Sequence, residues 1–182
     1  HALYTNTTGE DLVAVGRAAL YSNTTGEDNV AIGRSALQSN TTASNNIGIG
    51  YQALFAATTG NQNVAIGSNA LDANTVGDRN VAIGNYALTN FNPSSNADTY
   101  NVAIGYTAGN NLTTGVQNVL IGGIAGDALT VGSYNTVLGT TALGADTQGS
   151  KSTAIGYSTL VNQNFTSATD AYNTAVGYEA GQ

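Results

Sequence analysis

Few residues of this chain have the types and spacing that catalysis requires. The 182 residues include one histidine, His1, and no cysteine, so Ser-His-Asp, Cys-His and histidine-metal arrangements cannot be built within one chain. Residues 48–53 (GIGYQA) match a dinucleotide fingerprint, and residues 144–152 (GADTQGSKS) nearly match a phosphate-binding loop. No helix is expected after the first, and an extra Ser precedes the Lys of the second. We therefore expect a protein that is not an enzyme and holds no metal or cofactor.

Two acidic pairs form the next candidate site. Glu10-Asp11 recurs as Glu27-Asp28 after a spacing of 17, and four carboxylates on one edge could attract a divalent cation through their oxygens. The alternative is that they are solvated and partly offset by Arg17 and Arg34, which have the same spacing. Eleven acidic residues against four basic ones leave a net charge of −7. Because phosphate binding needs a basic patch, we expect no nucleic-acid partner.

The element that must position these residues is a short segment, NVAIG, that recurs along the whole chain. It is present verbatim at 29–33, 63–67, 80–84 and 101–105, with six close variants elsewhere. The last glycine of each copy recurs with a spacing of 17, apart from two spacings of 21. The sequence therefore predicts a single repeat domain, residues 1–182, of about ten coils.

The two longer spacings are ordered as well. Gly33, Gly105 and Gly177 follow one another at equal spacings of 72, so a unit of three short coils and one long coil occurs twice. The four-residue insertions fall near 89–100 and 161–172, and each of these segments contains a Phe and ends in Tyr.

The repeat reads N-V-A-I-G-x-x-A-L-x-x-N-T-T-G-x-x, and its positions are numbered here from the first Asn. Positions 2 to 4 carry small and β-branched apolar residues bounded by Gly, which indicates a strand, and a period of 17 is too short for two helices. We expect an all-β, parallel β-solenoid with 17-residue coils, stacked about 4.8 Å apart.

Side chains at position 4 form a column of aliphatic residues, from Val15 to Val176. We interpret positions 2 and 4 as structural core residues, buried at an interface between identical chains, because an exposed apolar stripe of this length is rare in monomers. A homotrimer suits a column shared by identical chains. The alternative is that this column fills the coil interior while Ala at position 3 faces outward. The core residues so predicted are Val30, Ile32, Ile49, Ile66, Ile83, Ile104, Ile121 and Ile155.

Glycine at position 5 occurs in every copy and is predicted to turn a tight corner, with positive φ or close backbone approach. The segment NTTG is predicted to form the second corner, and stacked Asn at position 1 could form an amide ladder. The predicted corner glycines are Gly33, Gly50, Gly67, Gly84, Gly105, Gly122, Gly139 and Gly156.

Aromatic residues of the insertions are the best candidates for recognition. Phe91 and Tyr100 lie in the first insertion, and Phe165 and Tyr172 lie in the second. Exposed aromatic side chains anchor interfaces and stack on sugars, so these four are predicted as contacts to a glycan or cell-surface receptor. The alternative is that they only pack the insertions onto the coil.

A column of threonines at position 13 favours another alternative, an ice-binding β-solenoid. Ice-binding faces usually need two parallel Thr ranks on a flat strand, whereas this column lies in a corner that ends in Gly. Its members are Thr7, Thr24, Thr41, Thr58, Thr75, Thr113, Thr130 and Thr147.

The pentamer followed by x-x-A resembles the head repeats of trimeric autotransporter adhesins (YadA-like heads) and the repeats of phage tail-fibre proteins. The segments NVAIGSNAL (63–71) and NIGIGYQAL (46–54) are the closest matches. The resemblance implies a left-handed parallel β-roll, trimeric, that forms a rod-shaped head or shaft. The period here is 17 rather than about 14.

These observations lead us to expect a structural or adhesive rod module of an extracellular trimeric fibre, on a cell surface or a virion. A purely structural filament subunit is the alternative. A chain that begins with His1 and has no Met is expected to be a processed product or a piece of a longer protein. Its apolar runs of about five residues fall far short of a membrane span, so no membrane insertion is expected.

Overall fold

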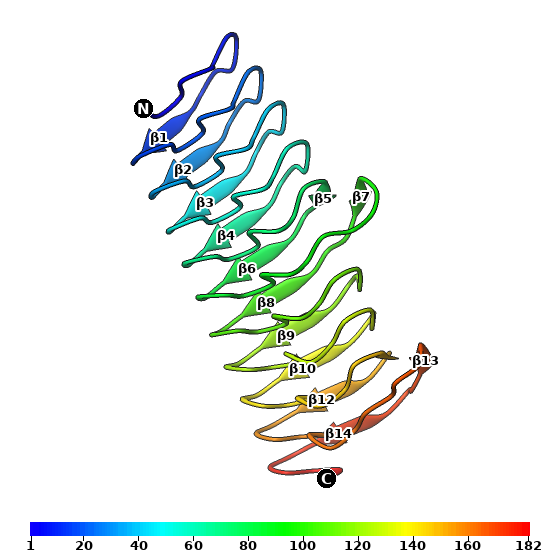
Figure 1. Ribbon diagram of the computed structural model, residues 1–182. Coiled ribbons are helices and arrows are strands. Elements are labelled where there is room, and N and C mark those ends of the chain that lie inside the picture. Colours follow the sequence, from blue (N-terminus) through cyan, green and yellow to red (C-terminus); the bar gives the residue numbers. More distant parts are fainter.

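The computed structural model describes residues 1–182 as a solenoid of stacked coils with no helix. The coils follow one another along a rod, with the two chain ends at opposite ends (Figure 1). Ten of the fourteen strands form one sheet, one strand per coil. They are β1 (Val13–Val15), β2 (Val30–Ile32), β3 (Ile47–Ile49), β4 (Val64–Ile66), β6 (Val81–Ile83), β8 (Val102–Ile104), β9 (Val119–Ile121), β10 (Thr136–Leu138), β12 (Thr153–Ile155) and β14 (Thr174–Val176).

All strand pairs are parallel, and each residue is paired with the residue at the same position of the next coil. Val30 pairs with Ile47, for example, and Ala31 with Gly48. The register also holds across the first insertion, where Val81 of β6 pairs with Val102 of β8. The predicted parallel β-solenoid with a period of 17 is confirmed.

The four remaining strands are short and connect each insertion to the coil before it. Each insertion adds a two-residue strand that pairs with the coil before it. They are β5 (Gly77–Asp78) with β7 (Ala97–Asp98), and β11 (Gly149–Ser150) with β13 (Thr169–Asp170).

The interior of the coil is lined by alanine at positions 3 and 8 and leucine at position 9. Ala31, Ala36 and Leu37 are fully buried, and the coils of β4 and β6 repeat the same fully buried set. The middle residue of each strand points inward, and it is small in most coils because the interior is narrow, while its branched neighbours point outward. None of the residues predicted as core at an interface between copies is buried within the single chain; they are Val30, Ile32, Ile49, Ile66, Ile83, Ile104, Ile121 and Ile155. The alternative, in which position 4 fills the coil interior and Ala faces outward, is therefore wrong. Burial of this column between copies stays a prediction.

Buried leucines adopt a backbone conformation that the sequence does not signal. Leu37 has φ of 50° and Leu54 has φ of 51°, and positions 7 and 17 are left-handed as well. This conformation costs an L-residue roughly 1–2 kcal/mol. Burying a leucine side chain contributes about 1.5–3 kcal/mol, enough to offset that cost.

Glycine at position 5 has positive φ in all ten coils, between 122° and 148°. A Cβ there would collide with the glycine of the next coil, except in the last coil. Both predicted features of the corner, the positive φ and the close backbone approach, are confirmed for all eight named glycines.

The buried asparagines at position 1 connect successive coils. The Oδ1 of Asn46 accepts the backbone N–H of Asn63 at 2.9 Å, and its Nδ2 donates to the carbonyl of Gly60 at 2.8 Å. The predicted ladder thus exists, but most of its bonds run from amide to backbone, because the N–H of position 1 has no carbonyl partner in the sheet. Direct amide-to-amide bonds occur at Asn80 and Asn118.

A second amide ladder lies in the NTTG corner and stops abruptly. Asn23 Nδ2 donates to Oδ1 of Asn6 at 2.9 Å, and Asn40 Nδ2 donates to Oδ1 of Asn23 at 2.6 Å. The next coil has Ala57 at this position, and Asn40 Oδ1 is the one buried side-chain polar atom without a partner. The ladder therefore ends for lack of a donor.

Ala57→Asn should extend this ladder. Its new amide would donate to Asn40 Oδ1 and remove an unsatisfied buried acceptor, which is worth about 1 kcal/mol. We expect higher stability in urea unfolding followed by circular dichroism. The control is Ala56→Asn, one residue earlier, where Asn90 and Asn111 occupy the same repeat position; equal stabilisation by both variants would contradict the explanation.

Candidate functional site

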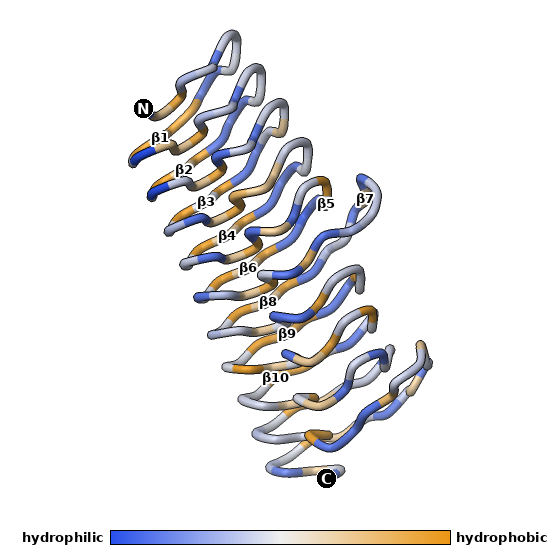
Figure 2. Tube along the Cα trace, viewed as in Figure 1, coloured by the Kyte–Doolittle hydropathy of each residue, from blue (hydrophilic) through white to orange (hydrophobic).

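The outward face of the ten-stranded sheet carries a continuous aliphatic column at position 4, while position 2 is Val or Ile in the first seven strands and Thr in β10, β12 and β14. Positions 2 and 4 of every strand point away from the coil interior, and the hydrophobic strand segments of successive coils line up along the rod (Figure 2). Ile32 is 38% exposed and Leu138 is 46% exposed. Contact with the coils above and below covers only part of each side chain, so the single chain leaves an aliphatic column open to solvent.

Tyrosines line both edges of this outward sheet face. Of the ten tyrosines in the chain, eight lie either just before the strand, at position 17, or just after its glycine, at positions 6 and 7. An apolar centre with tyrosine and arginine around it is the usual composition of a protein–protein interface. The eight are Tyr100, Tyr134 and Tyr172 on one edge and Tyr51, Tyr86, Tyr106, Tyr157 and Tyr178 on the other.

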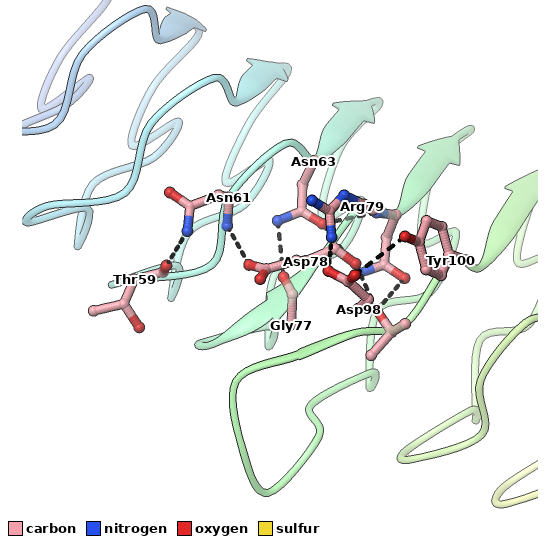
Figure 3. Close-up of polar contacts among 10 residues, drawn as sticks. Thr59, Asn61, Asn63, Gly77, Asp78, Arg79, Asp98 and Tyr100 are labelled. Atoms are coloured by element: carbon pink, nitrogen blue, oxygen red, sulfur yellow. Dashed lines mark hydrogen bonds and ion pairs between the residues drawn. The ribbon is translucent and has the colours of Figure 1, made fainter.

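The first insertion is tied to the preceding coil by a charged contact (Figure 3). Asp98 lies beside Asp78 in the β5–β7 pair and forms an ion pair with Arg79. The Tyr100 hydroxyl donates to Asp98 Oδ2 at 3.1 Å, and the Arg79 guanidinium lies 5.7 Å from the centre of the Tyr100 ring. A cation, a carboxylate and a phenol thus hold the insertion against the coil.

The second insertion repeats this arrangement with lysine in place of arginine. Lys151 Nζ donates to Asp170 Oδ2 at 2.6 Å and to the Tyr172 hydroxyl at 3.1 Å, and lies 5.0 Å from the ring centre. The hydrogen bond from Lys151 lowers the pKa of Asp170, and the same bond raises the pKa of Lys151. Both groups are exposed, so the contact orients the insertion more than it stabilises the fold.

The four aromatic residues predicted as receptor contacts have different surroundings. Tyr100 and Tyr172 are exposed, at 48% and 67%. Phe91 is fully buried and lies over Gly77, so the prediction that it contacts a receptor is wrong. It fills the interior at a position where most other coils place Asn or Leu. Phe165 is half-buried, and its backbone N–H donates to Asp146 at 3.0 Å.

The nucleotide-like motifs lie in ordinary parts of the solenoid. Residues 48–53 run from β3 into a turn, and residues 144–152 cover a corner and β11. The acidic pairs form no cluster placed to hold a metal ion, and no ion pair joins them to Arg17 or Arg34. Within the chain, these arginines therefore make no direct contact with the acidic pairs. No helix is long and apolar enough to cross a bilayer.

Threonine hydroxyls at position 13 are used in bonds between coils. Thr24 Oγ1 donates to the carbonyl of Thr41 at 2.9 Å, and Thr41 Oγ1 donates to that of Thr58 at 3.1 Å. The same bond recurs at Thr58, Thr113 and Thr130. These hydroxyls stabilise the stack, and their protons are not free to order water.

Comparison with known proteins gave no relatives. No protein-family model, no curated protein and no solved structure matches this chain.

Sequence reasoning did not find the contacts that orient the insertions. Arg79 and Lys151 occupy the same repeat position, at the end of the coil that precedes each long coil, and Asp98 and Asp170 occupy equivalent places within the insertions. An alignment of the two long units, each of three short coils and one long coil, would have shown this pairing of opposite charges, which is the one signal available.

Proposed function

We propose that this chain is a structural and adhesive rod module of an extracellular trimeric fibre, such as a cell-surface adhesin head or a phage tail fibre. In this proposal the coil is a left-handed β-roll, and three copies associate through their outward sheet faces. The insertions then lie at the solvent-exposed rim of this interface, and their surfaces are available for attachment. The protein is not an enzyme in this proposal, and it works outside the cell.

The observation that carries the proposal is the exposed aliphatic column. Full burial of one such side chain is worth about 1.5–3 kcal/mol, and these side chains are roughly half covered already. Ten coils would therefore gain on the order of 10 kcal/mol per copy, which is comparable with the cost of association. A rotation axis along the rod would bring like columns together at every coil, and a three-fold axis gives each column two partners.

Placing charges on the column tests self-association. Ile66→Lys combined with Ile83→Lys should dissociate the assembly to single chains, because two ammonium groups per copy would enter an apolar interface. The fold should persist, since both side chains point away from the coil interior. Sedimentation velocity gives the mass, and Thr42→Lys with Thr59→Lys, in an exposed corner, is the control of equal charge. A wild-type monomer would rule out the trimeric fibre.

The exposed tyrosines of the insertions support the adhesive part of the proposal. Each ring is fixed by a cation and a carboxylate, and fixed aromatic side chains lose little entropy when a sugar or protein stacks on them. The two sites are four coils apart, roughly 19 Å, so a repetitive glycan could contact both.

Tyr100→Ser combined with Tyr172→Ser should reduce binding on a glycan array at least about tenfold, as expected when aromatic anchors are removed. Tyr134→Ser is the matched control, because Tyr134 has the same repeat position in a coil without an insertion. Equal binding by the double variant and the control would exclude the insertions as the contact. Absence of any glycan binding by the wild type would favour a purely structural filament subunit.

A further inference from the structure

Unpaired opposite charges flank the first two strands of the sheet. Asp11 precedes β1 and Arg17 follows its corner glycine, while Asp28 and Arg34 flank β2 in the same way. All four side chains are exposed. The two ion pairs of the structure are Arg79 with Asp98 and Lys151 with Asp170, so none of these four charges is matched within the chain.

The two signs lie on opposite edges of the outward sheet face. Acidic residues occupy position 17, where the strand begins, and arginines occupy position 6, beyond the strand's end. Figure 2 shows the apolar strand segments of β1 and β2 with hydrophilic segments at both ends. Each of these coils therefore has a negative edge and a positive edge on either side of an apolar centre.

A rotation axis along the rod makes these edges complementary. Such a rotation turns the negative edge of one copy toward the positive edge of the next at the same height. In an antiparallel arrangement, β1 and β2 would face β14 and β12 instead. The only charged residue at positions 6 and 17 of those two coils is Lys151, which is already bonded to Asp170.

The apolar column does not fix the register between copies, whereas the charges do. Position 4 is aliphatic in every coil, and position 2 is Val or Ile in the first seven, so sliding one copy by a coil changes the apolar contact little. A slide of one coil would leave one of the two Asp–Arg contacts per interface, and a slide of two coils would leave none.

We propose that Asp11 and Asp28 of one copy pair with Arg17 and Arg34 of the next copy and thereby set the polarity and register of the assembly. This inference rests on the proposed self-association through the outward sheet face, and it adds the residues that align the copies. The partner is a second copy of this chain.

Charge reversal on either edge tests the pairing. Asp11→Lys with Asp28→Lys should weaken association at low salt at least about tenfold, because attraction becomes repulsion at two sites per interface. Arg17→Glu with Arg34→Glu should have the same effect. The left-handed backbone of position 17 accepts basic residues, since Arg79 and Lys151 have φ of 59° and 61° there.

The variant with all four reversals provides the decisive comparison. It has the net charge of the wild type and complementary edges of exchanged sign, so its association should return to near the wild-type level. Sedimentation equilibrium measures the constants, and circular dichroism verifies the fold of each variant. The differences should shrink in about 1 M salt, where the screening length is about 3 Å.

The possible failures can be told apart. If the wild type associates and the two edge variants associate equally well, the charge pairing is wrong while the proposed self-association stands. The pairing is also wrong if the fourfold variant remains as weak as the edge variants. A wild type that sediments as a single chain at every concentration would overturn both proposals.

Discussion

Gly67→Ala is expected to destabilise the solenoid by at least about 3 kcal/mol, through strain and steric overlap together. A Cβ on Gly67 would lie 2.5 Å from the carbonyl oxygen and 2.6 Å from the carbonyl carbon of Gly84 in the next coil. Those atoms belong to the backbone, and parallel strands hold them on both sides, so the clash has no local relief. The φ of 138° at Gly67 adds strain for any residue with a side chain.

Gly123→Ala is the matched control for this substitution. Gly123 directly follows the corner glycine Gly122, at position 6, where other coils have Arg, Tyr, Ser, Asn or Thr. An added Cβ there meets nothing within 4 Å, and we expect a change below about 0.5 kcal/mol. Urea unfolding followed by circular dichroism measures both variants. Similar midpoints for the two would show that close backbone approach does not constrain the corner.

Leu120→Ala is expected to cost about 2–5 kcal/mol, the usual range for a buried leucine. Leu120 is fully buried at position 3, where most coils have Ala. Position 9 holds glycine instead of leucine in the same region, at Gly109 and Gly126. A Cβ on Gly109 would lie only 2.6 Å from Leu120 Cδ1. In this region the large residue therefore lies at position 3 and the small residues lie at position 9, the reverse of the usual arrangement. Leu120 fills the space that the glycines leave.

Two further variants make this explanation testable. Leu138→Ala, on the outward face of the neighbouring strand β10, is the control; for the single chain we expect less than about 1 kcal/mol. Gly109→Leu in the Leu120→Ala background restores the regular pair of residues and should recover a large part of the lost stability. Leucines at position 9 have φ near 50°, and Gly109 has φ of 59°, so the backbone accepts the change. Additive destabilisation by both substitutions would contradict the exchange.

Much of the fold follows from the spacing of residues along the chain. A period of 17 brings each repeat position next to its own copy in the neighbouring coil, so a strand at positions 2 to 4 becomes a parallel sheet. Glycine at every position 5 marks the corner for the same reason. The two departures from the period locate the insertions without further information.

The direction in which side chains point was not determined by the spacing. Both sides of the strand are apolar, so alternation alone leaves two assignments, with Ile32 or Ala31 inward. The distance between the two walls of the coil decides between them, because only the small residue fits opposite Leu37. Phe91 is buried in one insertion for a related reason, since its coil offers an interior place that the sequence pattern does not reveal.

The repeat by itself thus determined the parallel solenoid, its corners and the places where it is interrupted, because these depend only on which residues stack. The tertiary structure decided which residues face inward, that leucines accept a left-handed backbone, and that a cation, a carboxylate and a tyrosine orient each insertion. These features depend on distances across the coil and between coils, and a pattern along one chain does not contain such distances.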